Sequence, residues 1–290
     1  MSILFSQLSS YLRLMRFDKP IPLLLLLWPT FWALWIASQG YPFFNLIFIF
    51  VLGTVLMRSA GCIVNDYVDR HIDSKVKRTQ LRPLATGVIS TKFALILFVI
   101  LCSAALGLVF FLNSFSRYLA VIGFVLTLMY PFTKRYFVAP QLFLGFTFSW
   151  GIMMAFAAVL NVLPLIAWHL YGATLVWVIL YDTEYALADR ADDVKLPIYS
   201  TAILFGSYDR LMIGILQIIF LVWMFWIGQR LAFGFFYNMG LVVVGALFVY
   251  QQKLISSREP VSCIKAFLNN HWVGLVIFMG IFLSLSLRAA

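Results

Sequence analysis

The chain has 290 residues, of which 63% are hydrophobic and 11% are charged, and its mean hydropathy is +0.97. This composition excludes a water-soluble globular fold. The 21 Lys and Arg residues outnumber the 11 Asp and Glu residues and give a net charge of +10, but they lie between apolar runs. They therefore indicate orientation in a membrane and not a nucleic-acid partner. The three cysteines lack the spacing of a zinc site or a disulfide framework.

Nine apolar segments are suited to cross the ~30 Å hydrocarbon core as helices of about 20 residues. In chain order they are residues 21–37, 43–64, 93–112, 118–131, 141–160, 165–187, 211–227, 235–250 and 272–287. The fourth is short and needs its flanks to span, so eight or ten helices are the alternatives. The first is too long for a secretory signal and lacks a cleavage site, so we expect it to be retained. We predict an all-α polytopic membrane protein in which residues 1–290 form a single integral-membrane domain.

Most basic residues fall on one side of this nine-segment topology. The N-terminal tail and every second loop carry seventeen of them: Arg13, Arg16, Lys19, Arg70, Lys75, Lys77, Arg78, Arg82, Lys92, Lys134, Arg135, Arg190, Lys195, Arg210, Lys253, Arg258 and Lys265. The opposite side carries three, Arg117, Arg230 and Arg288. Because cytoplasmic loops are enriched in Lys and Arg, we expect a cytoplasmic N-terminus and an external C-terminus.

Eight of the eleven carboxylates fall in two short clusters at the ends of the second and sixth segments. They are Asp66, Asp69 and Asp73, and Asp182, Glu184, Asp189, Asp192 and Asp193. The first three are spaced by three and four residues, and Asp182, Asp189 and Asp193 by seven and four, so each set shares one helix face. Such stacked charges repel each other unless a cation lies between them. The alternative is that acids at helix ends only mark the water boundary.

Oxygen ligands without His or Cys suit Mg²⁺, Mn²⁺ or Ca²⁺. Magnesium usually takes one or two carboxylates and completes its shell with water and phosphate oxygens. Both acidic segments run from outside to inside in the predicted topology, so both clusters emerge at the cytoplasmic side. The pattern therefore predicts two carboxylate groups that clamp metal ions around a diphosphate.

Basic residues follow the first acidic cluster and the fourth apolar segment. They are Lys75, Lys77, Arg78 and Arg82 in one loop, and Lys134 and Arg135 in the turn YPFTKRY, where Tyr130 precedes Lys134 by one helical turn. Each has an alternative role as an orientation signal or a headgroup contact. Their place beside the carboxylates predicts that some neutralise the diphosphate, and Arg82 is favoured because Pro83 restricts its backbone.

Arg58 lies inside the second apolar segment, where a cation is costly and usually faces a partner or an aqueous cavity. Asn65 follows it by seven residues and Asp69 by eleven, so Arg58 shares the face of the first acidic cluster about two turns deeper. One interpretation is that Arg58 binds an anionic substrate. The alternative is that it pairs with backbone or extends to the membrane surface.

The order of these motifs resembles the UbiA family of intramembrane prenyltransferases. Residues 65–73 match its N-D-x-x-D-x-x-x-D pattern, residues 189–193 match D-x-x-x-D, and residues 130–134 match Y-x-x-x-K. The segments RLMRFDKP, LLLLWPTFWALW, RSAGCIVNDY, STAILFG and YQQKLI resemble the bacterial members that prenylate 4-hydroxybenzoate. The resemblance runs from about residue 10 to about residue 285 and implies nine helices around a central cavity with a side opening to lipid.

The resemblance also implies roles for particular residues. Metal association is implied for Asn65, Asp69, Asp73, Asp189 and Asp193. With the basic residues above, the predicted diphosphate-binding set is Asn65, Asp66, Lys77, Arg78, Arg82, Tyr130, Lys134 and Arg135. The predicted catalytic set is Asp69, Asp73, Asp189, Asp193 and Asp182, with Asp189 or Asp182 as the proton acceptor.

The implied reaction is Mg²⁺-dependent transfer of a polyprenyl group from its diphosphate to the carbon ortho to the hydroxyl of 4-hydroxybenzoate, in ubiquinone synthesis. It implies the bacterial inner membrane as location and the lipid bilayer as partner, with no nucleic acid and no obligate protein partner. A related enzyme with another acceptor, a naphthoate or a porphyrin, is the nearest alternative. A cation transporter is the alternative from another class, but the basic loops beside the acids would repel a free cation.

Overall fold

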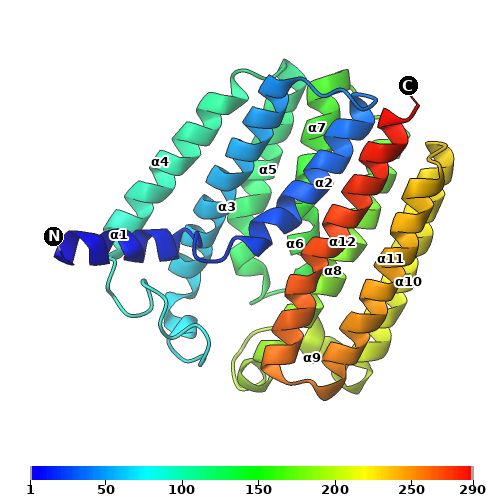
Figure 1. The fold of residues 1–290 in the computed structure, drawn as a ribbon. Coiled ribbons are helices and arrows are strands. Elements are labelled where there is room, and N and C mark those ends of the chain that lie inside the picture. Colours follow the sequence, from blue (N-terminus) through cyan, green and yellow to red (C-terminus); the bar gives the residue numbers. More distant parts are fainter. Residues whose placement is uncertain (1, 289–290) are drawn as a thin grey trace.

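The computed structural model describes residues 2–288, with side chains from residue 8 onward, and within that range it is helical without a strand. The helices are α1 (Ser2–Leu14), α2 (Ile21–Ala37), α3 (Phe44–Asp73), α4 (Thr91–Val109), α5 (Ser114–Thr133), α6 (Pro140–Phe148), α7 (Trp150–Leu160), α8 (Leu165–Asp193), α9 (Thr201–Phe205), α10 (Asp209–Arg230), α11 (Phe235–Leu254) and α12 (Pro260–Ser286), with 3₁₀ turns η1 (Gly206–Tyr208) and η2 (Ile255–Ser257). The long helices form one bundle, and α1 lies across it (Figure 1).

The membrane spans agree with the sequence prediction when α2 is included. Within the described residues, eight segments are long and apolar enough to cross a membrane, counting α6 with α7 and α9 with α10 as one segment each. The apolar helix α2 has 17 residues, which is at the short end of the range for a span. The fourth predicted segment, residues 118–131, belongs to a helix of 20 residues that begins four residues earlier, at Ser114. Asn113 caps this helix by accepting a hydrogen bond from the Ser116 amide.

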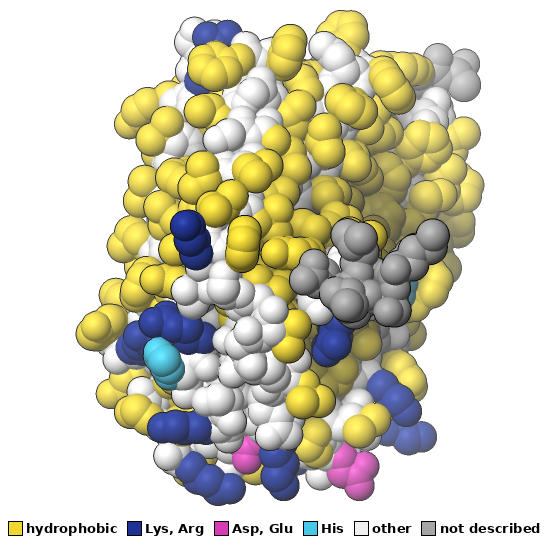
Figure 2. Space-filling view, turned by 90° about the vertical axis from the view of Figure 1, so that its left-hand side faces the viewer, with side chains coloured by type: hydrophobic (Ala, Val, Ile, Leu, Met, Phe, Trp, Pro, Cys, Tyr) yellow, Lys and Arg dark blue, Asp and Glu magenta, His cyan; other side chains and the backbone are white. Residues whose placement is uncertain are grey.

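The two helices with acidic clusters extend beyond the apolar segments. The segment predicted at 43–64 belongs to α3, which ends at Asp73, and the segment predicted at 165–187 belongs to α8, which ends at Asp193. Helical spacing therefore continues through both clusters. The two helices run in the same direction and end at the same end of the bundle (Figure 1). Lys, Arg, Asp and Glu side chains gather toward that end, and hydrophobic side chains cover the middle of the face in Figure 2.

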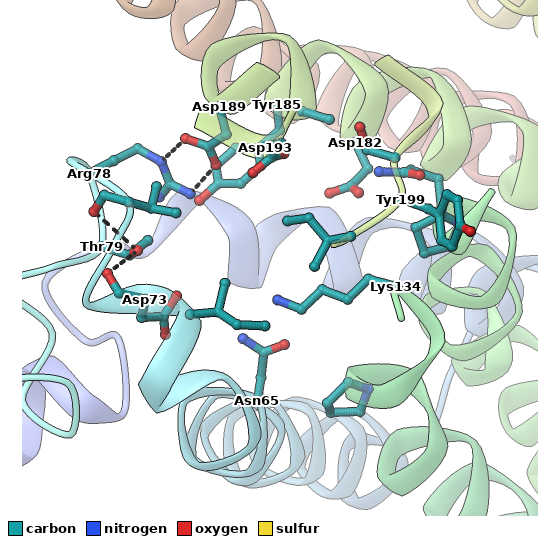
Figure 3. A pocket seen from close by; sticks show the side chains of 18 of the residues that line it. Asn65, Asp73, Arg78, Thr79, Lys134, Asp182, Tyr185, Asp189, Asp193 and Tyr199 are labelled. Carbon is teal, nitrogen blue, oxygen red and sulfur yellow. Dashed lines mark hydrogen bonds and ion pairs between the residues drawn. The ribbon is translucent and has the colours of Figure 1, made fainter. Parts of the chain in front are cut away.

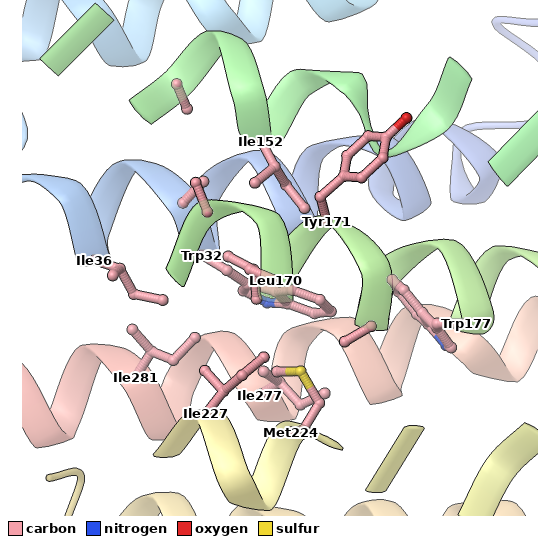
Figure 4. Packing of buried hydrophobic residues seen from close by; sticks show 14 of the residues in the cluster. Trp32, Ile36, Ile152, Leu170, Tyr171, Trp177, Met224, Ile227, Ile277 and Ile281 are labelled. Carbon is pink, nitrogen blue, oxygen red and sulfur yellow. The ribbon is translucent and has the colours of Figure 1, made fainter. Parts of the chain in front are cut away.

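One side of the bundle is densely packed around two tryptophans. Trp32 of α2 and Trp177 of α8 are fully buried, with ring centroids 5.3 Å apart. Each indole N–H is satisfied, because Trp32 donates to the Gly274 carbonyl and Trp177 to Asn270 Oδ1, both at 3.0 Å. Side chains from α2, α8, α10 and α12 meet around this pair (Figure 4). This side holds α8 in a fixed position relative to α2 and α12.

The opposite side is more open. There α4 packs along α3 at the edge of the bundle in Figure 1, but it barely touches α5 apart from their connection. A small buried cluster joins α1, α3 and α4 through Leu14, Ala60, Ile63 and Leu101. The space enclosed between α2, α3, α4, α5 and α7 is a large cavity, described with the site below.

Candidate active site

A polar pocket of about 150 Å³ lies between the ends of α3 and α8. Asn65 and Asp73 line it from α3, and Asp182, Asp189 and Asp193 line it from α8. Figure 3 shows the side chains of the two helices on opposite sides of the pocket, with Lys134 pointing between them. The two acidic clusters, more than a hundred residues apart in the sequence, therefore face each other across one space.

The loop after α3 folds back over this pocket through two arginines. Arg78 pairs with both oxygens of Asp189, with its Nε 2.7 Å from Oδ1, and its guanidinium lies 4.5 Å from the centre of the Tyr185 ring. Arg82 donates to Asp73 at 2.8 Å and to Asp66 at 3.0 Å. The loop thus connects α3 to α8 by ion pairs that a phosphate group would also satisfy.

A third cation reaches the pocket from the end of α5. Lys134 pairs with Asp69, whose side chain is fully buried. Arg135 donates to the Val68 carbonyl at 2.8 Å and lies 3.6 Å from Asp69 Oδ1, which accepts no hydrogen bond. Asp69 therefore holds Lys134 beside the pocket and does not itself line it.

The arginines of the loop are fixed positive charges. Burial disfavours the charged form of Arg82, but the carboxylates of Asp66 and Asp73 outweigh this effect and raise its pKa. Burial likewise disfavours charged Arg78, and its neighbours Tyr185 and Asp189 raise its pKa despite that cost. Both guanidinium groups stay charged and so favour an anionic ligand in the pocket.

The oxygen atoms that remain available fit a magnesium ion. Within the described side chains, Asp182 and Asp193 line the pocket without making an ion pair, and Asn65 adds an amide oxygen beside them. Among residues 2–288, no three His, Cys, Asp or Glu side chains converge as a complete metal cage. An incomplete oxygen set is what Mg²⁺ requires when phosphate oxygens and water complete its shell.

Arg58 lines a second, larger cavity of about 710 Å³, and Asn65, Arg82 and Tyr130 line both spaces. Its guanidinium makes only long contacts, 3.8 Å to Cys62 Sγ and 3.4 Å to the Lys19 carbonyl. The cation is therefore poorly satisfied by the protein itself. Burial, together with the charge of Arg16, lowers the pKa of neighbouring Lys19, as expected where positive charge is concentrated.

Comparison with known proteins identifies the family of this chain. The sequence profile described as the UbiA prenyltransferase family matches residues 26–281. The chain belongs to the UbiA prenyltransferase family. It is 54% identical over 278 residues to the 4-hydroxybenzoate octaprenyltransferase of Coxiella burnetii (strain CbuK_Q154), covering 96% of this chain and 97% of that one. It is 52% identical over 277 residues to the enzyme of the same name from Methylococcus capsulatus, covering 96% and 95%.

Solved structures of UbiA homologues share the fold. The apo structure of a UbiA homologue from Aeropyrum pernix K1 superposes with a TM-score of 0.77 at 21% identity, covering 89% of this chain and 97% of that one. A UbiA homologue from Archaeoglobus fulgidus bound to GPP and Mg²⁺ superposes with a TM-score of 0.71 at 16% identity, covering 96% and 99%. The all-α fold predicted from the sequence is thereby confirmed.

The UbiA fold brings together most of the residues singled out in the sequence. Those that line the polar pocket are Asn65, Asp73, Arg78, Arg82, Tyr130, Lys134, Asp182, Asp189 and Asp193. Five predicted residues lie elsewhere, one of them Arg58 in the larger cavity. Asp66 faces the larger cavity, Asp69 and Arg135 lie behind Lys134, and the Lys77 side chain is exposed, with only its backbone amide 3.4 Å from Asp192.

The structure also adds residues that the sequence analysis did not select. Arg16 donates to both oxygens of Asp66 at 2.8 and 2.9 Å from the turn between α1 and α2. Tyr185 and Tyr199 line the polar pocket. The spacing of Tyr185, three residues after Asp182 and four before Asp189, places it on the same helix face and was a signal in the sequence. No sequence pattern indicated that Arg16 pairs with Asp66, because fifty residues separate them.

Proposed function

We propose that this chain transfers a polyprenyl group from a polyprenyl diphosphate to the ring carbon ortho to the hydroxyl of 4-hydroxybenzoate, giving 3-polyprenyl-4-hydroxybenzoate for ubiquinone biosynthesis. The observation that carries this proposal is the junction of two spaces. A pocket of carboxylates and cations shares Asn65, Arg82 and Tyr130 with an apolar cavity, and that cavity contains the poorly satisfied Arg58. The relatives named 4-hydroxybenzoate octaprenyltransferase support the choice of substrates.

The diphosphate belongs in the polar pocket. Arg78, Arg82 and Lys134 would bind its oxygens, with Asp69 acting through Lys134. Asn65 and Asp193 would hold Mg²⁺, joined by Asp73 and Asp189 once the diphosphate replaces these two carboxylates as the partner of Arg82 and Arg78. Bound there, Mg²⁺ supplies positive charge that stabilises the leaving diphosphate. The ion pairs of Arg78 with Asp189 and of Arg82 with Asp73 keep these cations in place before the substrate arrives.

The prenyl carbon then lies at the junction of the two spaces. Its bond to the diphosphate oxygen breaks, the electron pair leaves with the oxygen, and an allylic cation remains. Tyr130 lines both spaces, and its ring face is suited to stabilise that cation. The walls of the larger cavity, which include Phe50, Phe124 and Trp150, exclude the water that would otherwise capture it.

The acceptor is oriented by its carboxylate. Arg58 would form a charge-assisted pair with the carboxylate of 4-hydroxybenzoate, which directs the phenol end toward the junction. The ring carbon forms the new carbon–carbon bond and gives up its proton. We assign the proton acceptor to Asp182, because Asp189 is paired with Arg78 and is therefore the weaker base.

The pocket favours this reaction over cation transport. Three cations line the same pocket as the acids, and they attract phosphate and repel a free metal ion.

The identity of the acceptor is tested with the purified protein in lipid nanodiscs. The protein is supplied with a polyprenyl diphosphate, Mg²⁺ and either 4-hydroxybenzoate or 1,4-dihydroxy-2-naphthoate. We expect a prenylated product from 4-hydroxybenzoate alone and none in EDTA. A product from the naphthoate alone would assign the other acceptor, and no product from either would refute prenyl transfer.

We further propose a multi-pass protein of the bacterial inner membrane with the polar pocket on the cytoplasmic side. The positive charge of the loops around the pocket supports this orientation. Single cysteines at Lys77 and Lys195 should react with a membrane-impermeant maleimide from the cytoplasmic side, and one at Arg230 from the outer side. Labelling of Lys77 and Lys195 from opposite sides would refute both the topology and the two-cluster pocket.

A further inference from the structure

Asp66 is a buried carboxylate of α3 that lines the larger cavity and not the polar pocket. Its side chain is 1% exposed, and two guanidinium groups donate hydrogen bonds to it. Arg16 donates to Oδ1 at 2.8 Å and to Oδ2 at 2.9 Å, and Arg82 donates to Oδ1 at 3.0 Å. A buried carboxylate is costly unless it is paired in this way. Asp66 therefore depends on both arginines.

Arg82 is held by one edge of its guanidinium group. Its Nη1 atom donates both to Asp66 and to Asp73, at 3.0 and 2.8 Å. Within the described residues, its Nε and Nη2 atoms donate no hydrogen bond. An edge with two such N–H groups can bind a phosphate through two parallel hydrogen bonds. The two carboxylates thus fix one edge of Arg82 and leave the other for the diphosphate.

Asp66 is the carboxylate that can stay with Arg82 when the diphosphate binds. In the proposed function, Asp73 turns from Arg82 to Mg²⁺ at that moment. Asp66 does not line the polar pocket, so it remains available to Arg82. The other arginine of the loop, Arg78, has its own second support, because its guanidinium lies 4.5 Å from the centre of the Tyr185 ring.

Arg16 reaches Asp66 from the turn between α1 and α2. Its φ angle of +62° is left-handed, which is uncommon for a residue with a side chain. Just before the turn, Leu14 is fully buried in a cluster with side chains of α3 and α4. The Nη1 atom of Arg16 also donates to the Arg13 carbonyl at 3.0 Å. The end of α1 therefore fixes the point from which Arg16 extends to Asp66.

We propose that Asp66 is a positioning residue that holds Arg82 for the diphosphate, and that Arg16 acts through Asp66 by balancing its charge. This inference rests on the proposed prenyl transfer. Without Arg16, the buried charge of Asp66 has Arg82 as its remaining partner and draws it away from the substrate. Without Asp66, Arg82 loses its fixed position when Asp73 turns to Mg²⁺. Both losses affect the diphosphate and not 4-hydroxybenzoate.

The test measures binding of inorganic pyrophosphate in the presence of Mg²⁺ by isothermal titration calorimetry, with the purified protein in nanodiscs. Arg16→Ala and Asp66→Asn should each weaken this binding about tenfold, the factor expected for one charge-assisted hydrogen bond. The double variant should also lose about tenfold, because a residue that acts only through its neighbour adds no loss of its own. KM for the prenyl diphosphate should follow the same pattern, and KM for 4-hydroxybenzoate should not change.

Arg13→Ala is the matched control. Arg13 carries the same charge in the last turn of α1, but its side chain is exposed and forms no ion pair with the described carboxylates. We expect the affinity of the wild type from this variant. Asp66→Asn keeps the shape of the side chain, so it decides the inference even if Arg16→Ala folds poorly.

Three outcomes would overturn the inference. They are unchanged pyrophosphate binding in Asp66→Asn, a loss of about a hundredfold in the double variant, and a raised KM for 4-hydroxybenzoate alone in Arg16→Ala. Wild-type protein that forms no prenylated product would refute the proposed function itself. An active wild type whose variants bind pyrophosphate normally would refute only the positioning of Arg82.

Discussion

Replacing Arg58 by alanine should affect the binding of one substrate and not of the other. The reason is that Arg58 lines the larger cavity and not the polar pocket proposed for the diphosphate. In the proposed complex its guanidinium pairs with the carboxylate of 4-hydroxybenzoate. Removal of the guanidinium should therefore weaken binding of the acceptor and leave binding of the prenyl diphosphate intact. The same change should have little effect on folding, since the contacts of Arg58 with Cys62 and with the Lys19 carbonyl are long.

The expected increase in KM for 4-hydroxybenzoate follows from the hydrogen bonds that the substitution removes. A bidentate pair makes two charge-assisted hydrogen bonds, worth about 1.5 kcal/mol each in net terms. Their sum of about 3 kcal/mol corresponds to roughly a hundredfold increase in KM for 4-hydroxybenzoate, because each 1.4 kcal/mol is a factor of ten. Arg58→Lys should recover part of this loss, because lysine keeps the charge but not the planar fork.

The assay measures initial rates in nanodiscs, varying one substrate at saturating concentration of the other. Arg70→Ala is the matched control, since Arg70 lies on the same helix and carries the same charge but bonds only the Tyr67 carbonyl and stacks on the Tyr67 ring. We expect normal constants from the control. An Arg58→Ala enzyme with a raised KM for the prenyl diphosphate alone, or with unchanged constants and a lower yield, would refute the assignment of Arg58 to the acceptor.

Two further predictions concern the metal and the core. Asp73→Asn and Asp189→Asn should each lower kcat at least about a hundredfold and shift the Mg²⁺ requirement upward, while protein yield is kept; near-normal rates in both would refute the metal assignment. Asn270→Ala should lower the free energy of unfolding by about 1–3 kcal/mol, because the buried Glu184 carboxylate loses its 2.8 Å hydrogen bond. Asn238→Ala is the control, since Asn238 Oδ1 accepts no hydrogen bond, and unfolding in detergent that does not distinguish the two variants would contradict the reasoning.

The grouping of residues around the candidate pocket was largely predictable from the sequence, because membrane helices impose a simple geometry. The ~30 Å hydrocarbon core sets the length of each span, so the ends of α3 and α8 follow from hydropathy and the direction of both follows from counting spans. Helical spacing then places Asp73 on one wall and Asp189 and Asp193 on the other. The residues that the sequence grouped by position but the fold separates are Asp66 and Asp69, which share the helix and differ in the side they face.

The sequence by itself determined the class of fold, the family and the chemical types around the pocket, since these depend on local hydropathy and on residues close together in the chain. Only the tertiary structure decided which cation meets which acid. Arg16 reaches Asp66 and Arg78 reaches Asp189 through the folding of loops, and no periodicity encodes those contacts. The open side between α4 and α5 is likewise a matter of packing, because the apolar residues of α4 would look the same in the sequence whether they contacted α5, lipid or a prenyl tail.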